Sequence, residues 1–127
     1  VNVKKFFSYD LDKYLKKADI IKSSEINRNI AIAVCPEYIN DIVLAAQVAD
    51  ELLNITDIQA SFVLVKIEDD ILISGRSLGN INVQVILEYL GGGGHMTMAG
   101  AKMKFITFED CLKKLKIAID KYFKEGE

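Results

Sequence analysis

The residues with the clearest chemical potential are a run of four glycines and the histidine that follows it. Gly91 to Gly94 stand directly before His95, the only histidine of the chain. Glycines expose backbone N–H groups and let a phosphate approach closely, and a histidine can donate a hydrogen bond to it. A helix beginning after the glycines would add the partial positive charge of its N-terminus. The segment therefore predicts a site for a phosphate group.

The same segment has a simpler interpretation, as a flexible connection between two helices in which His95 only caps or packs. It is not a Walker loop, because no Gly-Lys-Ser/Thr follows. It also lacks the preceding strand of a dinucleotide-binding fingerprint, since a helix is expected before it. A phosphate site here needs a second anchor.

An arginine would be a suitable second anchor, and the chain has only two candidates, Arg28 and Arg76. Arg76 ends the hydrophobic run "ILISGRS" beside Ser77, where a charge would project toward a crevice of the kind in which α/β sheets hold ligands. A weak surface ion pair is the alternative for either arginine, and Arg28, in the turn "NRN", fits it better. We expect Arg76 to bind the phosphate.

Composition excludes several other functions. The formal net charge of -2 gives no cationic field for long nucleic acid. Cys35 and Cys111 stand far apart without metal-ligand spacing, which predicts buried thiols in a reducing compartment. No cluster of histidines and carboxylates suggests a two-metal centre, so no catalytic or metal-binding residue is expected in this chain. The residues alone indicate a binding domain for a compact anion.

The hydrophobic pattern predicts a single α/β (α+β) domain, with a mixed sheet of four to five strands flanked by helices. A hairpin and a parallel crossover through a helix are expected in this sheet. The expected strands are residues 29–35, 60–67, 71–77 and 103–106. Five helices are expected. One starts at residue 10, and three others run over residues 38–53, 83–90 and 107–123. The fifth follows the glycines, with Met96, Ala99, Gly100 and Met103 at helical spacing. Asn80 or Asn82, and Thr107, are the expected N-caps.

The segments "SGRS" (Ser74 to Ser77) and "NVQVILEYLGGGGH" (Asn82 to His95) resemble the DHH-associated domain of the DHH phosphoesterase superfamily. The form with four glycines is most similar to bacterial membrane-anchored cyclic di-AMP phosphodiesterases. The resemblance covers nearly the whole chain from about Ile26 onward. It implies that nucleotide phosphates are bound by residues of the strand end and of the Gly91-to-His95 loop, namely Arg76, Ser77, Gly92, Gly93, Gly94 and His95.

The resemblance also implies the wider context. Residues 1–127 would form one substrate-binding domain of a longer cytoplasmic enzyme, with residues 1–25 as a connecting helix region. The longer enzyme, anchored in the cell membrane, would hydrolyse cyclic di-AMP to pApA with two manganese ions held by a separate DHH domain of the same chain. This chain alone is expected to bind no cofactor and to be inactive, and a homodimer is compatible with its sequence. Three alternatives stay open: a nanoRNase or pAp-phosphatase type of substrate domain, a tRNA-binding module like that of alanyl-tRNA synthetase, and an interaction domain that has lost its ligand, which Arg76 and His95 disfavour.

Overall fold

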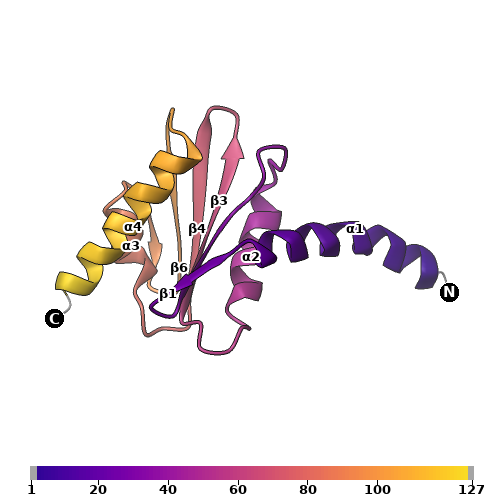
Figure 1. Cartoon of the computed structure of the whole chain (residues 1–127), viewed down its shortest axis with the longest axis horizontal. Helices are drawn as coiled ribbons and strands as arrows, with labels where there is room; N and C mark the ends of the chain where they lie inside the picture. The colour runs from indigo at the N-terminus through magenta and orange to yellow at the C-terminus, as the bar shows by residue number, and fades with distance from the viewer. Residues whose placement is uncertain (1–2, 126–127) are drawn as a thin grey trace.

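The computed structural model describes residues 3–125, with side chains described from residue 11 onward. A six-stranded sheet in the order β1-β2-β3-β4-β6-β5 lies between two layers of helices (Figure 1). Helices α3 and α4 cover one face, α2 covers part of the other, and α1 projects away from the body on the α2 side. The helices are α1 (Val3–Lys22), α2 (Ile42–Leu52), α3 (Val83–Glu88) and α4 (Phe108–Glu125); the strands are β1 (Glu25–Asn27), β2 (Ile30–Val34), β3 (Ala60–Ile67), β4 (Asp70–Ser77), β5 (Gly93–His95) and β6 (Met98–Met103).

The predicted mixed α/β fold is confirmed. Strands β3 and β4 form the expected antiparallel hairpin, and β2 pairs in parallel with β3 after the crossover through α2. The sheet has six strands rather than four to five, because the short edge strands β1 and β5 had no sequence pattern of their own. Strand β1 pairs with β2 through a tight turn at Arg28 and Asn29, whose φ angles are 53° and 65°.

The helix expected after the glycine run was wrong. Residues Gly93–His95 and Met98–Met103 form an antiparallel hairpin instead, and the strand expected at residues 103–106 ends at Met103. Burial along β6 alternates, since Ala99 and Ala101 are buried while Met98, Gly100 and Lys102 are exposed. This period of two is that of a strand with one solvated face.

The predicted N-caps of α3 and α4 are confirmed, whereas α1 begins at Val3 rather than at residue 10. Asn82 caps α3 by accepting a hydrogen bond from the Val85 N–H at 3.2 Å, and Thr107 caps α4 in the same way from the Asp110 N–H at 3.1 Å. Helix α2 begins at Ile42 rather than at Tyr38, because the Asp41 carboxylate caps it. Each cap fixes the entry of a helix onto the sheet.

The sheet is buried on both faces at its centre, which explains the continuous apolar run of β3. Phe62 and Leu64 belong to the core under α3 and α4, and Val63 and Val65 belong to the core under α2. Strand β4 is paired with β3 on one side and with β6 on the other. Arg76 therefore lies on a strand at the buried centre of the sheet.

Candidate functional site

Arg76 and His95 lie on the same face of the sheet, with one strand between them. Arg76 pairs with Met98 across β4 and β6, and Met98 pairs with His95 across β6 and β5. Directly opposed residues of neighbouring strands share a face, so the three side chains form one row. Two strand spacings place the Arg76 and His95 Cα atoms about 10 Å apart. Two long polar side chains at that separation can contact one nucleotide.

A second row beside the first consists of small residues. Ser74, Gly100 and Gly93 are paired across the same three strands and share the face of Arg76. A Cβ atom added to Gly93 would meet no heavy atom within 4 Å, and Gly100 is exposed. The row is therefore a floor made mostly of backbone, onto which a ligand can settle closely.

This part of the sheet is open to solvent. Helix α2 packs on β3 and β4, and on β6 the residues that face its side, Met98, Gly100 and Lys102, are exposed. Met98 in particular keeps 51% of its surface exposed. The candidate site is thus an open face of β4, β6 and β5 rather than an enclosed cavity, so a ligand on it would need a second surface to be covered.

The four glycines have different roles. Gly91, with φ of 83°, ends α3: its N–H donates to the Glu88 carbonyl at 3.0 Å, and the Gly92 N–H donates to the Leu87 carbonyl at 2.8 Å. This is the Schellman pattern of helix termination. A Cβ on Gly92 would lie 2.2 Å from the Gly100 carbonyl oxygen, and one on Gly94 would lie 2.5 Å from the Met98 carbonyl oxygen.

These roles change the expected basis of phosphate binding. The N–H groups of Gly91 and Gly92 already end a helix, and His95 is followed by a strand rather than by a helix N-terminus. A helix macrodipole therefore contributes nothing at this point. The attraction of a phosphate to this face must therefore come from charged side chains. Arg76, in the row with Met98 and His95, is such a side chain.

The Arg76 guanidinium is fixed by two contacts. Its Nε donates to the Asp50 carboxylate of α2 at 3.0 Å, and its Nη1 donates to the Gly75 carbonyl at 2.9 Å. The Arg76 side chain is only 13% exposed, whereas that of Asp50 is 60% exposed. The charge thus lies at the junction of α2 and the open face.

Ser77 is not brought to the same place. It is buried, its neighbours along β4 alternate in exposure, and its hydroxyl accepts a hydrogen bond from the Gly79 N–H at 2.9 Å. The structure therefore places the Ser77 side chain in the turn after β4, on the face opposite to Arg76. A contact between Ser77 and a ligand stays a prediction.

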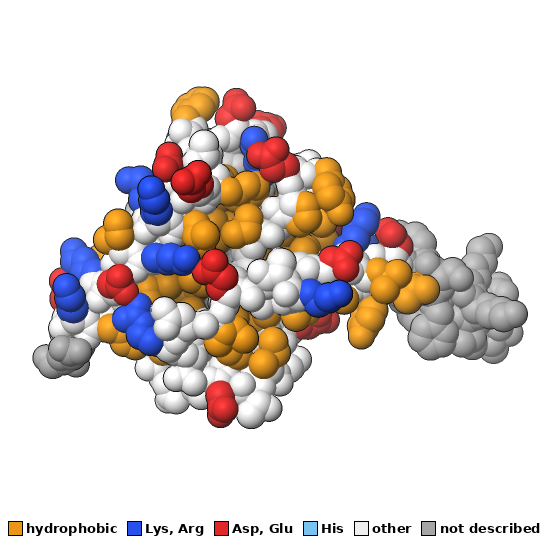
Figure 2. Space-filling model, in the orientation of Figure 1, with side chains coloured by type: hydrophobic (Ala, Val, Ile, Leu, Met, Phe, Trp, Pro, Cys, Tyr) orange, Lys and Arg blue, Asp and Glu red, His pale blue; other side chains and the backbone are white. Residues whose placement is uncertain are grey.

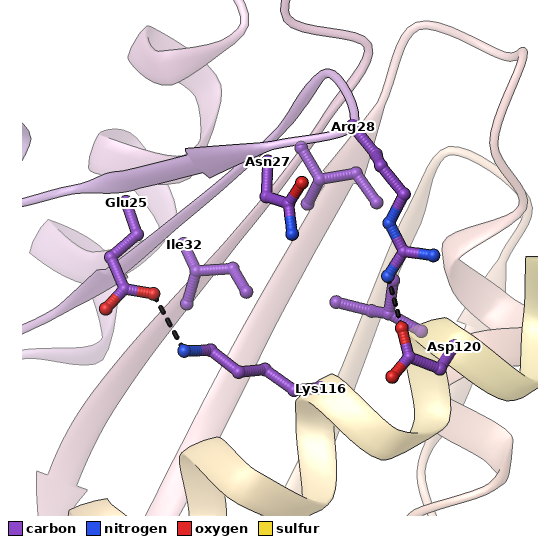
Figure 3. Close-up of a pocket in the computed structure, with 8 residues that line it drawn as sticks. Glu25, Asn27, Arg28, Ile32, Lys116 and Asp120 are labelled. Carbon is purple, nitrogen blue, oxygen red and sulfur yellow. Dashed lines mark hydrogen bonds and ion pairs between the residues drawn. The ribbon is translucent and has the colours of Figure 1, made fainter.

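Arg28 lines a separate pocket of about 170 Å³ between the β1–β2 turn and α4 (Figure 3). Arg28 is paired with Asp120 there, and Lys116 with Glu25 at 2.9 Å, over a floor of isoleucines. Figure 2 shows this side of the molecule, with lysine and arginine side chains gathered over α4. Because each of the two cations has its own carboxylate, the pocket has no free charge with which to attract an anion.

Comparisons with known proteins identify the family of this chain. Residues 27–125 match the DHHA1 domain family. The chain belongs to this family. The DHHA1 domain is 43% identical over 131 residues to the cyclic-di-AMP phosphodiesterase GdpP of Bacillus subtilis (strain 168), a match that covers 99% of this chain and 20% of the relative. It is 42% identical over 125 residues to the cyclic-di-AMP phosphodiesterase PdeA of Listeria monocytogenes serotype 1/2a (strain 10403S), covering 96% of this chain and 19% of the relative.

A solved structure shares the fold of this DHHA1 domain. An exopolyphosphatase-related protein from Bacteroides fragilis superimposes with a TM-score of 0.77 at 20% identity, covering 87% of this chain and 34% of that one. The chain spans about one fifth of the length of the curated relatives it matches. No helix within residues 3–125 of the DHHA1 domain has the length and apolar character needed to cross a membrane.

Potential metal ligands occur among the residues with described side chains. Among them, no three or more His, Cys, Asp or Glu residues come together as ligands for an ion. The two manganese ions implied by the resemblance were expected in a separate DHH domain, and that expectation stays a prediction.

Sequence reasoning gave no role to several residues of the open face. Asp50 lies 26 residues before Arg76 and carries no motif, so only the packing of α2 on the sheet reveals their contact. Ser74 and Gly100 were not assigned to the site either, since residues 96–103 were expected to form a helix. The pairing of β6 with β4 is the missing information.

Proposed function

We infer that this DHHA1 domain is the substrate-binding part of a phosphodiesterase that hydrolyses cyclic di-AMP to pApA. The row formed by Arg76, Met98 and His95 carries the proposal, because it sets a nearly buried cation and a hydrogen-bonding imidazole on one open face. Relatives named as cyclic-di-AMP phosphodiesterases are 42% and 43% identical over almost the whole chain, which supports this substrate.

In this proposal Arg76 contacts a phosphate through the donors that Asp50 and Gly75 leave unused. His95 donates a second hydrogen bond from the edge strand, and the backbone floor at Gly93 and Gly100 lets the nucleotide lie close to the sheet. The exposed Met98 between the two polar residues offers a polarizable surface for a purine.

Hydrolysis itself is assigned to another part of the longer protein. An open face binds a ligand on one side only, and a DHH domain with two manganese ions would form the opposite wall of the cleft. We expect the 127-residue chain to bind adenine nucleotides weakly and to hydrolyse none of them, since half of the cleft is absent.

The two arginines provide a matched test. Calorimetric or NMR titration with pApA and cyclic di-AMP is expected to show binding that Arg76→Ala weakens by about tenfold or more, as for loss of a charge-assisted hydrogen bond. Arg28→Ala, which removes a guanidinium from the other face, should leave the affinity unchanged. Binding that survives Arg76→Ala, or falls equally in both variants, would remove the open face from the proposal.

The same titrations separate the alternatives. Tighter binding of pAp than of pApA would indicate a pAp-phosphatase type of substrate domain. Binding of tRNA without binding of small nucleotides would indicate a tRNA-binding module, which the net charge of -2 disfavours.

A further inference from the structure

We propose that Asp50 is a positioning residue for nucleotide binding, which holds the Arg76 guanidinium with its terminal nitrogens directed to the open face. This inference rests on the function proposed above and goes beyond it, because Asp50 itself would not contact the ligand. It assigns a role to a carboxylate on α2, an element outside the motifs that the sequence offers.

The hydrogen bonds of Arg76 indicate which of its donors remain for a ligand. A guanidinium has five N–H donors in a fixed planar arrangement. Asp50 takes the one on Nε and the Gly75 carbonyl takes one on Nη1, so three remain, two of them on Nη2. These two contacts therefore leave Nη2, and one N–H of Nη1, as the donors that phosphate oxygens could use.

Burial explains why this contact should affect the orientation of Arg76. The Arg76 side chain is 13% exposed and the Asp50 side chain is 60% exposed, so the carboxylate stays hydrated while it holds a cation that is largely removed from water. A long side chain has many rotamers, and an ion pair at Nε together with a backbone contact at Nη1 restricts them before the ligand arrives. The entropy lost on binding is then smaller.

Electrostatic repulsion would act in the opposite direction. A carboxylate beside Arg76 repels a phosphate, and if repulsion dominated, removing Asp50 would tighten binding. The two effects predict opposite signs for Asp50→Ala, and they can be separated with Asp50→Asn. The asparagine keeps an oxygen that accepts from Nε and loses the charge.

Four variants of the 127-residue chain make the test. We expect Asp50→Ala to weaken pApA binding by about five- to tenfold, within the range for an ordinary hydrogen bond, because Asp50 orients Arg76 and does not itself contact the ligand. Asp50→Asn should bind at least as tightly as the wild type, because orientation is kept and repulsion is removed. Glu51→Ala is the matched control on the same helix, since Glu51 pairs with Lys17 at 3.3 Å and not with Arg76. It should leave the affinity unchanged, and Arg76→Ala gives the lower limit of binding.

Two readouts distinguish positioning from a general effect on the fold. Affinity for adenosine, which has no phosphate, should not change in Asp50→Ala. The Nε–Hε signals in a ¹⁵N NMR spectrum provide the second readout, because the chain has only two arginines and Arg76→Lys assigns them. The Arg76 signal should be slow to exchange in the wild type and in Asp50→Asn, and should broaden in Asp50→Ala.

The outcomes separate this inference from the proposed function. If the wild type binds pApA and Arg76→Ala does not, unchanged or tighter binding by Asp50→Ala would overturn the role of Asp50 alone. If Asp50→Asn weakens binding as much as Asp50→Ala, hydrogen-bond positioning is also refuted. A wild-type chain that binds no nucleotide, or binds it independently of Arg76, would overturn the proposed function and this inference with it.

Discussion

Replacement of Gly92 by alanine should destabilise the domain, although the added group is a single methyl. A Cβ at this position would lie 2.2 Å from the Gly100 carbonyl oxygen and 2.7 Å from the Ala101 Cβ. Carbon and oxygen atoms normally stay about 3.3 Å apart or more, so β5 or β6 would have to move by about 1 Å. The closest atom belongs to the backbone and cannot rotate away. Overpacking of this kind costs about 1–3 kcal/mol, and we expect about 2–3 kcal/mol because the β5–β6 pairing is strained as well.

Gly93→Ala is the control, because the same methyl added one residue later would meet no heavy atom within 4 Å. Its free energy of unfolding should stay within about 0.5 kcal/mol of the wild type or rise slightly, since alanine restricts the unfolded chain. The chain has no tryptophan, so urea unfolding is best followed by far-UV circular dichroism. Gly92→Ala with the same stability as Gly93→Ala would refute the crowding argument and the placement of β5 against β6.

The remaining predictions concern binding, pH and a buried hydroxyl. Gly93→Ala should fold normally yet weaken pApA binding by about fivefold in titration, because its methyl would stand on the backbone floor of the open face. Burial raises the pKa of both Cys35 and Cys111 from 9.0 to about 11, so the stability that the neutral thiols contribute is complete below pH 9 and is lost as the pH rises toward 11. Urea unfolding from pH 8 to 11 should show this loss, and it should be smaller with alanine at both positions. Ser61→Ala should lower the free energy of unfolding by about 1 kcal/mol in the same assay, because the Ser61 hydroxyl donates to the Ala49 carbonyl at 2.6 Å in the core.

The elements with strong periodicity were predictable from the sequence. The β3–β4 hairpin has the expected bounds to within one residue, and α4 starts where Thr107 was expected to cap it. The region from Gly93 to Met103 was not predictable, because small apolar residues such as Ala99 and Ala101 suit a helix and a strand about equally. Its pairing with β4 decides the outcome, and that pairing is a long-range contact.

The candidate site was predicted for a partly different reason from the one the structure supports. Arg76 and His95 were expected to converge, and they do share a face. The glycine run was expected to act through a helix N-terminus. In the structure, the N–H groups of Gly91 and Gly92 instead end α3, and Gly92 packs closely against β6. Single-sequence patterns report residue types well, but they do not report which backbone donors are already engaged.

The edge position of β5 has a consequence for dynamics. His95 lies on a three-residue strand that is hydrogen-bonded to the sheet on one side only, whereas Arg76 lies on β4, which has a neighbour on each side. Amide protons of β5 should therefore exchange with deuterium through small local openings long before those of β4. A nucleotide that bridges His95 and Arg76 would link the edge strand β5 to the central strand β4 and reduce the local opening of β5. Slower exchange confined to β5 would therefore itself report that the ligand is bound.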